Sequence, residues 1–273
     1  MPKFVFLWTD FVLWLIAAGV LFYIWRVRRN ARVKANWSHV LRDAPAMCAA
    51  VVLGVFITIA LLDSVHFRPR LSAVEGASAD APMAYGTRTL SIFDALLSHA
   101  IEAREKTYST PLAYWSFQKE TQVVDGKEVR GNPRLAHGGS HLIQPEREWR
   151  ADIAARSFHG VLFGMLAGLA IAVATAALIG RKGGGLRLSL SQIARGVTEI
   201  PWRPMLITVI VTAMIIGWLA ALWPYYHPFG TDRTGNDVLY QALKSIRTAV
   251  VIGSLATIAT LPLAIALGVL AGY

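Results

Sequence analysis

The sequence predicts an all-α protein that crosses a membrane about five times and carries a large mixed segment outside the bilayer. Only 16% of its 273 residues are charged and 55% are hydrophobic, whereas soluble domains carry about 25% charged residues. The apolar residues also gather in long uncharged runs, and about 20 such residues cross a bilayer as a helix. Together, composition and the long runs indicate a polytopic membrane protein.

Five apolar runs are long enough to be membrane spans. They cover residues 4–25, 44–62, 158–180, 205–223 and 249–272. The first contains Asp10, which is either a membrane-embedded carboxylate or an interfacial residue near the outer end of the span. The fifth contains Pro262, which lacks a backbone N–H, so we expect a kink there.

The distribution of charge predicts which segments face the cytoplasm. Residues 26–43 and 181–203 together hold eleven basic and two acidic residues, which accounts for nine of the ten net positive charges. The long segment 63–156 holds twelve of each sign and is neutral. This is the positive-inside pattern and not a nucleic-acid footprint, so we expect membrane lipid and no nucleic acid as a partner. The N-terminus and the neutral segment are then outside the cytoplasm.

These patterns divide the chain into four segments: 1–62, a transmembrane hairpin with a basic loop; 63–156, the outer segment; 157–223, a second hairpin; and 224–273. Within the outer segment, the apolar spacing of residues 91–106 predicts a helix. Residues 121–130 surround an Asp-Gly pair and predict a small hairpin.

Small residues recur every four positions in two of the spans. Such stripes let helix backbones approach closely in lipid, where tight packing replaces the hydrophobic driving force. We therefore expect helix–helix packing faces in the third and fifth spans. The candidate packing residues are Gly160, Gly164, Gly168, Ala172, Gly268 and Gly272.

Motifs for catalysis or cofactor binding are not evident in the sequence. His137 and His141 flank a Gly-Gly pair and are predicted to be solvated loop residues, because a zinc site needs three or four ligands. Residues 180–186 lack the Gly-Lys-Ser/Thr ending of a phosphate-binding loop. We expect no catalytic residue, no metal ligand and no cofactor site in this chain. If ATP is used, another chain must bind it.

The most informative stretch begins at His227. Pro228, Gly230 and Gly235 mark turns, while Asp232 and Asp237 are suited to cap the segment that follows. The apolar residues of 238–246 share one helical face, which predicts a short interfacial helix before the fifth span. Arg247 then lies at the membrane boundary.

This stretch resembles the C-type permease subunits of the dipeptide, oligopeptide and nickel ABC importers. Their periplasmic segment typically reads H-P-x-G-T-D-x-x-G-R-D-V-L-S-R, followed by an arginine and a span that ends L-x-A-G-Y. Asn236 replaces the usual arginine, and Tyr240-Gln241 replaces Ser-Arg. The residues that match in register are His227, Pro228, Gly230, Thr231, Asp232, Gly235, Asp237, Val238, Leu239, Arg247 and Leu270 to Tyr273.

The resemblance implies a non-enzymatic permease subunit of an ATP-driven importer in the bacterial inner membrane. Its implied partners are a second permease, two cytoplasmic ATPase subunits that bind ATP, and a periplasmic solute-binding protein. Family members continue past A-G-Y into further spans and an ATPase-docking loop, so we expect an incomplete permease fold, truncated at Tyr273. The alternative hypothesis is a membrane-anchored periplasmic binding or scaffold protein without transport activity.

Overall fold

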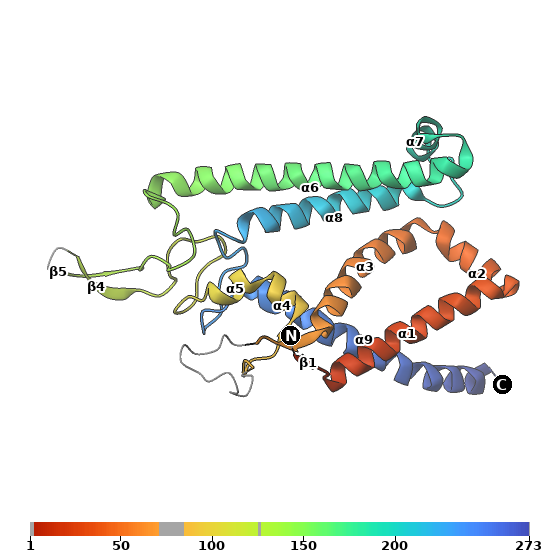
Figure 1. Cartoon of the computed structure of the whole chain (residues 1–273), viewed down its shortest axis with the longest axis horizontal. Helices are drawn as coiled ribbons and strands as arrows, with labels where there is room; N and C mark the ends of the chain where they lie inside the picture. Colours follow the sequence, from red (N-terminus) through yellow and green to blue (C-terminus); the bar gives the residue numbers. More distant parts are fainter. Residues whose placement is uncertain (1–2, 71–84, 125–126, 273) are drawn as a thin grey trace, which may run out of the picture. The chain divides into compact units, whose positions relative to one another are not determined.

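A computed structural model describes residues 3–70, 85–124 and 127–272 of the chain (Figure 1). The described part is mainly helical and contains five short strands. The elements in chain order are β1 Lys3–Val5, α1 Trp8–Arg29, α2 Ala31–Arg42, α3 Ala44–Ser64, β2 His66–Arg68, β3 Leu90–Ser91, α4 Ile92–Leu96, α5 Ser98–Glu102, β4 Glu120–Val124, β5 Lys127–Gly131, α6 Pro145–Gly183, α7 Leu186–Arg195, α8 Trp202–Leu222 and α9 Val238–Gly272.

Each predicted span overlaps a helix that is long and apolar enough to cross a membrane. These helices are α1, α3, α6, α8 and α9. Their length and composition confirm the class of all-α multi-pass membrane protein. The first span begins later than predicted, because residues 3–5 pair as a strand with β2. Helix α6 begins earlier than predicted, with Pro145 at its first turn, where the missing N–H is not needed.

Two sequence predictions of helices were wrong in detail. The helix predicted over residues 91–106 is two short helices, α4 and α5, separated at Leu97. Its expected last turn leaves helical geometry because the amide of Glu105 donates to the carbonyl of Gly235. The short interfacial helix predicted before the fifth span is the first part of α9, which continues unbroken through Pro262.

The chain forms two compact units, which are described separately. Unit 1 comprises Met1–Ala31, Val55–Ser98 and Ala242–Tyr273. It contains an antiparallel sheet in which β2 lies between β1 and β3. Its small apolar core is formed by Leu13, Ala60 and Val251, which come from α1, α3 and α9.

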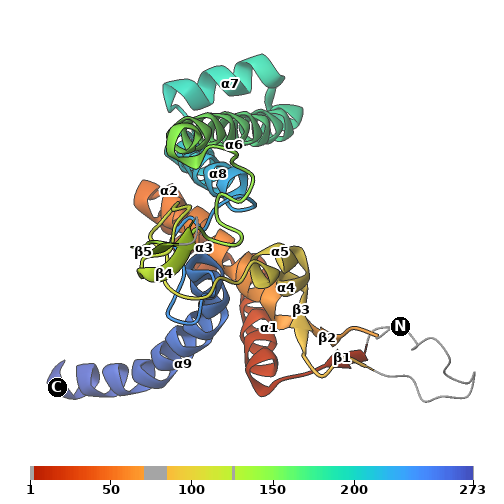
Figure 2. The same ribbon diagram turned by 90° about the vertical axis from the view of Figure 1, so that its left-hand side faces the viewer.

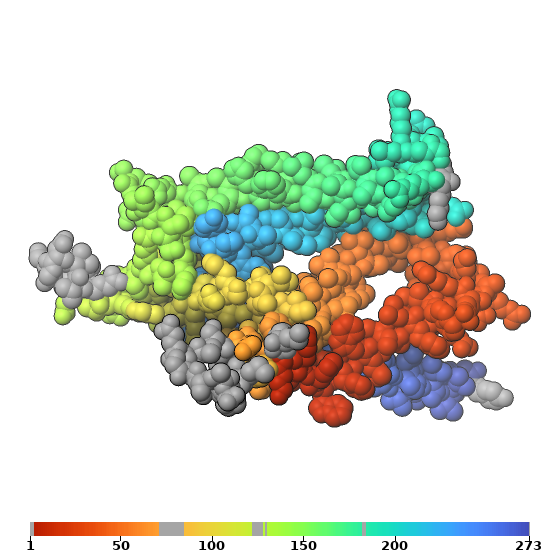
Figure 3. All heavy atoms as spheres, in the orientation of Figure 1, coloured from red at the N-terminus to blue at the C-terminus, as the bar shows by residue number. Residues whose placement is uncertain are grey.

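Unit 2 comprises Arg32–Gly54 and His99–Gln241. It contains the antiparallel pair β4–β5, which confirms the strands of the predicted hairpin; its Asp-Gly turn lies outside the described residues. Its main feature is the packing of α6 against α8, which are in contact along their length (Figure 3). A Cβ at Gly160 would lie 2.6 Å from the carbonyl oxygen of Gly217. The glycines therefore allow the two backbones to touch.

Helix α7 joins α6 to α8 and runs crosswise to both. Figure 1 shows α7 end-on beside α6 and α8 in side view, and Figure 2 shows α7 from the side. It is attached through Ile193, which packs with Ala176 of α6 and Leu206 of α8. Gly196 ends the helix in the left-handed conformation, with φ of 70°. In the sequence, this short basic segment between two apolar spans is typical of a loop, so α7 was not predicted.

We predict different effects on stability for two glycine-to-alanine substitutions. In Gly164→Ala, the new methyl group collides with the backbone of Ala213 and Met214, so the helices must separate. We expect a loss of about 1–3 kcal/mol in the free energy of unfolding. In Gly253→Ala, no described atom lies within 4 Å of the new methyl group, and the better helix former is neutral or slightly stabilising. Unfolding of both variants in detergent, followed by circular dichroism, measures the difference. Equal stability of the two variants would contradict the close packing of α6 against α8.

Candidate functional site

The residues singled out from His227 to Asp237 fold into one loop of unit 2, named here the motif loop. His227 is 97% buried, and its Nδ1 lies 2.8 Å from Oδ2 of Asp237. The other oxygen of Asp237 accepts the backbone N–H of Tyr240 and caps the start of α9. Pro228, between these anchors, is buried. One carboxylate therefore fixes both the imidazole and the helix.

Two glycines of the motif loop are required by the close approach of another segment. Gly230 and Gly235 have φ of 74° and 78°, in the left-handed region that glycine adopts readily. A Cβ at either position would also overlap a backbone carbonyl, of Ser109 for Gly230 and of Glu105 for Gly235. Thr231 lies between them, and its hydroxyl donates to the carbonyl of Thr107 at 2.8 Å. Residues 105–110 therefore form the other side of the motif loop.

Glu105 is the central acidic group opposite His227. It is buried, and its carboxylate accepts three backbone N–H groups, from Ala136, His137 and Gly138, at 2.7–3.0 Å. Its Oε1 lies 3.6 Å from Nε2 of His227, which is an ion-pair distance rather than a hydrogen bond. The imidazole thus lies between two buried carboxylates.

This arrangement shifts the pKa values of both groups strongly. Burial lowers the pKa of His227, but the hydrogen bond with Asp237 and the interaction with Glu105 outweigh burial and raise it to about 9. Burial raises the pKa of Glu105, but His227 and the three backbone N–H groups outweigh burial and lower it to about 2. At neutral pH His227 is therefore an imidazolium and Glu105 is a carboxylate.

Asp232 orders the exposed part of the motif loop. Its carboxylate accepts the backbone N–H groups of Thr234 and Asn236 at 2.8 and 2.9 Å. It also accepts the side chains of Thr234, Asn236 and Gln241. These bonds hold the pKa of Asp232 well below its ordinary value, although partial burial acts in the opposite direction. The loop is thus ordered from within by one carboxylate.

Arg247, the matching arginine that follows the motif loop, belongs to a different group of charges in unit 1. Its Nη1 lies 2.6 Å from Oδ1 of Asp10, and its Nε lies 3.2 Å from Oδ2 of Asp63. Asp10 also bonds His66 Nδ1 at 2.9 Å and accepts the N–H of Leu7 at the start of α1. Together with Asp94 and Lys244, these residues are named here the ion cluster: Asp10, Asp63, His66, Asp94, Lys244 and Arg247.

The ion cluster links the start of α1, the end of α3 and the first part of α9. Lys244 pairs with both oxygens of Asp94, one of them at 2.6 Å. Ser91 donates to Asp63 at 2.7 Å. All three aspartates are fully or almost fully buried. Asp10 is therefore buried within the protein and ion-paired at the start of α1.

The candidate packing residues differ in their surroundings. Gly160, Gly164 and Gly168 contact the backbone of α8, and Ala172 packs beside the core of α6, α7 and α8. Gly268 and Gly272 on α9 have no described atom within 4 Å of a built Cβ. Within the described residues, these two glycines therefore make no close approach of the kind seen in α6.

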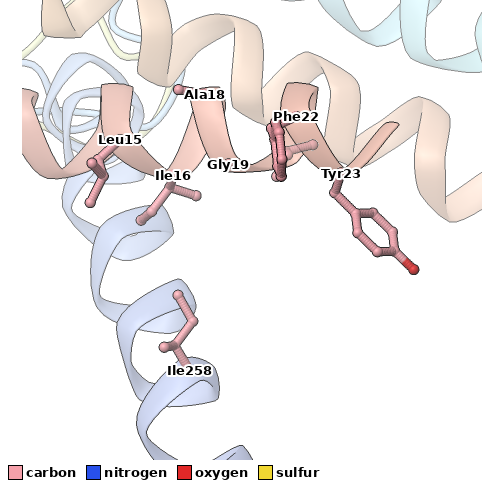
Figure 4. A pocket seen from close by; sticks show the side chains of 8 residues that line it. Leu15, Ile16, Ala18, Gly19, Phe22, Tyr23 and Ile258 are labelled. Carbon is pink, nitrogen blue, oxygen red and sulfur yellow. The ribbon is translucent and has the colours of Figure 1, made fainter. Parts of the chain in front are cut away.

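Other candidates from the sequence do not form a reactive site. His141 bonds Asp152 at 2.9 Å, while His137 is exposed. In residues 3–70, 85–124 and 127–272, no three His, Cys, Asp or Glu side chains gather into a metal-binding group. Figure 4 shows an apolar groove in unit 1, lined by seven α1 residues between Leu15 and Tyr23 and by Ile258 of α9. Its lining carries no charged group.

Sequence reasoning missed Glu105 and most of the ion cluster. Glu105 lies in the outer segment, where it is one of twelve acidic residues, and nothing local distinguishes it. A signal did exist for the ion cluster: Asp10 and Asp63 lie near the ends of two apolar runs on the same predicted side as Arg247. Buried charges require partners. Two acids and a base that are predicted to lie at the same depth in the membrane are therefore expected to pair.

Comparison of the chain with family models, with curated proteins and with solved structures gives no significant match. The class is defined by the fold alone: the described residues include five helices that are long and apolar enough to cross a membrane, as in a multi-pass membrane protein.

We predict that His227 makes stability fall at alkaline pH. Its folded pKa of about 9 exceeds its ordinary value of 6.5, so its stabilisation is complete below about pH 6.5 and lost as pH rises through about 9. Glu105 acts oppositely: its contribution is present above pH 4.5 and lost as pH falls through about 2. Thermal unfolding of wild type and His227→Gln between pH 6 and 10 tests this. The wild-type advantage should shrink with rising pH, whereas exposed His39→Gln should show no such trend.

We predict that Arg247→Gln destabilises unit 1 through the charges it leaves behind. Asp10 and Asp63 would stay buried without their guanidinium partner, and such a loss costs about 3–5 kcal/mol. The double variant Asp10→Asn/Arg247→Gln should lose less than the sum of its single variants. Exposed Arg28→Gln is the matched control. Strict additivity in urea unfolding would show that the two side chains do not interact.

Proposed function

We propose that the chain is a permease subunit of an ATP-driven ABC importer for peptides or similar small solutes, located in the bacterial inner membrane. The observation that carries the proposal is the spacing of the motif from His227 to Asp237, with Arg247 and the L-x-A-G-Y ending in the same register. The five apolar helices are consistent with a translocation subunit.

The contacts of the motif residues support a structural role for each of them. His227 and Asp237 bind one another, Gly230 and Gly235 accommodate neighbouring carbonyls, and Asp232 orders the loop. In the proposal, this preformed loop shapes the periplasmic mouth of the pathway. The chain performs no covalent chemistry and carries no cofactor of its own.

The proposed partners follow from the same resemblance. They are a second permease subunit, two cytoplasmic ATPase subunits and a periplasmic solute-binding protein. ATP binding to the ATPases would drive alternating access, in which the pathway opens to one side at a time. The N-terminus would lie in the periplasm, since the basic segments 26–43 and 181–203 favour the cytoplasm.

The proposal predicts ATP-dependent uptake that requires this chain. In its host, deletion of the gene should abolish uptake of a labelled short-peptide pool, and the full chain should restore it. The variant Gly230→Ala, which collides with the backbone of residues 109–110, should not restore uptake, whereas Gly253→Ala should. The tagged product of the complete gene should co-purify with ATPase subunits in mild detergent.

Two outcomes would overturn the transport proposal. One is unchanged uptake of peptides and other small solutes after deletion. The other is a purified complex without any nucleotide-binding subunit. Both together would favour the alternative, a membrane-anchored periplasmic binding or scaffold protein, in which the motif loop has a purely structural role.

A further inference from the structure

Helix α7 is oriented differently from α6 and α8, the two long helices that it connects. It lies crosswise to α6 and α8 at the end where they are connected (Figures 1 and 2). If α6 and α8 cross the bilayer, a helix perpendicular to them lies parallel to the membrane surface. Ile193 and the buried Ser189 fix α7 against this end of unit 2. Its position is therefore set by packing.

The apolar face of α7 is only partly covered by the protein. Leu186, Leu190 and Ile193 recur at helical spacing and share one face. Ile193 is 7% exposed, whereas Leu186 and Leu190 are 42% and 39% exposed. In water this uncovered apolar area would be unfavourable. At a membrane surface, the boundary between headgroups and acyl chains covers it.

The exposed charges around α7 are almost all positive. Arg187 and Arg195 on α7 are exposed, as are Arg181 and Arg203 on the neighbouring helix ends. Glu199 is the only acidic residue in 181–203. Each basic residue at an anionic membrane surface contributes about 1 kcal/mol, which is about a fivefold change in attachment. Charge complementarity therefore selects anionic lipid over zwitterionic lipid.

We propose that α7 is an interfacial helix that binds anionic phospholipid headgroups. Arg187 and Arg195 contact the phosphates, while Leu186 and Leu190 insert into the boundary of the acyl chains. The inference rests on the geometry of unit 2 and does not depend on the transport proposal. It requires only that α6 and α8 cross the bilayer.

The test places one fluorescent probe on α7 of the full chain. In a Cys48→Ser background, Ala194→Cys, beside the face of Leu186 and Leu190, is labelled with an environment-sensitive dye. Gln192→Cys, on the side of α7 away from Leu186 and Leu190, is the matched position. Both native residues are exposed. The protein is reconstituted in vesicles of phosphatidylcholine and phosphatidylglycerol, with bromine on the chains of one lipid or the other.

We expect brominated phosphatidylglycerol to quench the 194 probe more strongly than brominated phosphatidylcholine, and the 192 probe to be quenched less by both. Arg187→Gln/Arg195→Gln should remove the preference between the lipids, since two charges together account for about a 25-fold change in attachment. The control substitution Arg130→Gln, at an exposed position on β5, should leave the preference between the two lipids unchanged.

Three results would overturn the inference. Equal quenching by both brominated lipids at position 194 would exclude anionic selectivity. Equal quenching of the 192 and 194 probes would exclude the proposed orientation. Protection of the 194 probe from aqueous iodide without quenching by either lipid would mean that a protein surface, rather than lipid, covers α7.

Discussion

The buried imidazolium of His227 is the interaction on which the motif loop depends. A buried charge is unfavourable unless opposite charges and hydrogen bonds compensate for it, and His227 obtains this compensation from Asp237 and Glu105. Because Asp237 also caps α9, the same contact fixes where the last helix begins. Because Glu105 binds the backbone of residues 136–138, it also ties the outer segment to the motif loop.

In unit 1, buried charges are also compensated by opposite charges, but by different residues. Its ion cluster places three aspartates, a lysine, an arginine and a histidine where α1, α3 and α9 meet. An isolated charge at such a position would disfavour insertion. Paired charges instead select one arrangement of the helices, because each acid requires a base at the same depth. The cluster thus gives specificity that the small apolar core of Leu13, Ala60 and Val251 does not supply.

The sequence predicted those features that depend on local composition. Apolar runs revealed all five long helices, and the glycine spacing indicated the face of α6 that contacts α8. It did not reveal α7, because the three glycines just before this helix and the basic residues around it are typical of a loop. The packing of α7 also depends on Ala176 and Leu206, which are distant in the sequence. The motif residues were identified by spacing, but Glu105 was not. Its importance comes from tertiary contacts with distant segments, which a single sequence does not encode locally.

The internal bonds of the motif loop have a consequence for any molecule that contacts it. Asp232 already satisfies the donors of Thr234, Asn236 and Gln241, so the loop has its final conformation before contact. Flexible loops lose conformational entropy when a partner orders them, and this loss weakens binding. A preordered loop avoids most of that loss. Its association with another molecule is therefore limited by the removal of water from its polar groups, and shape complementarity rather than folding on contact determines which molecules fit.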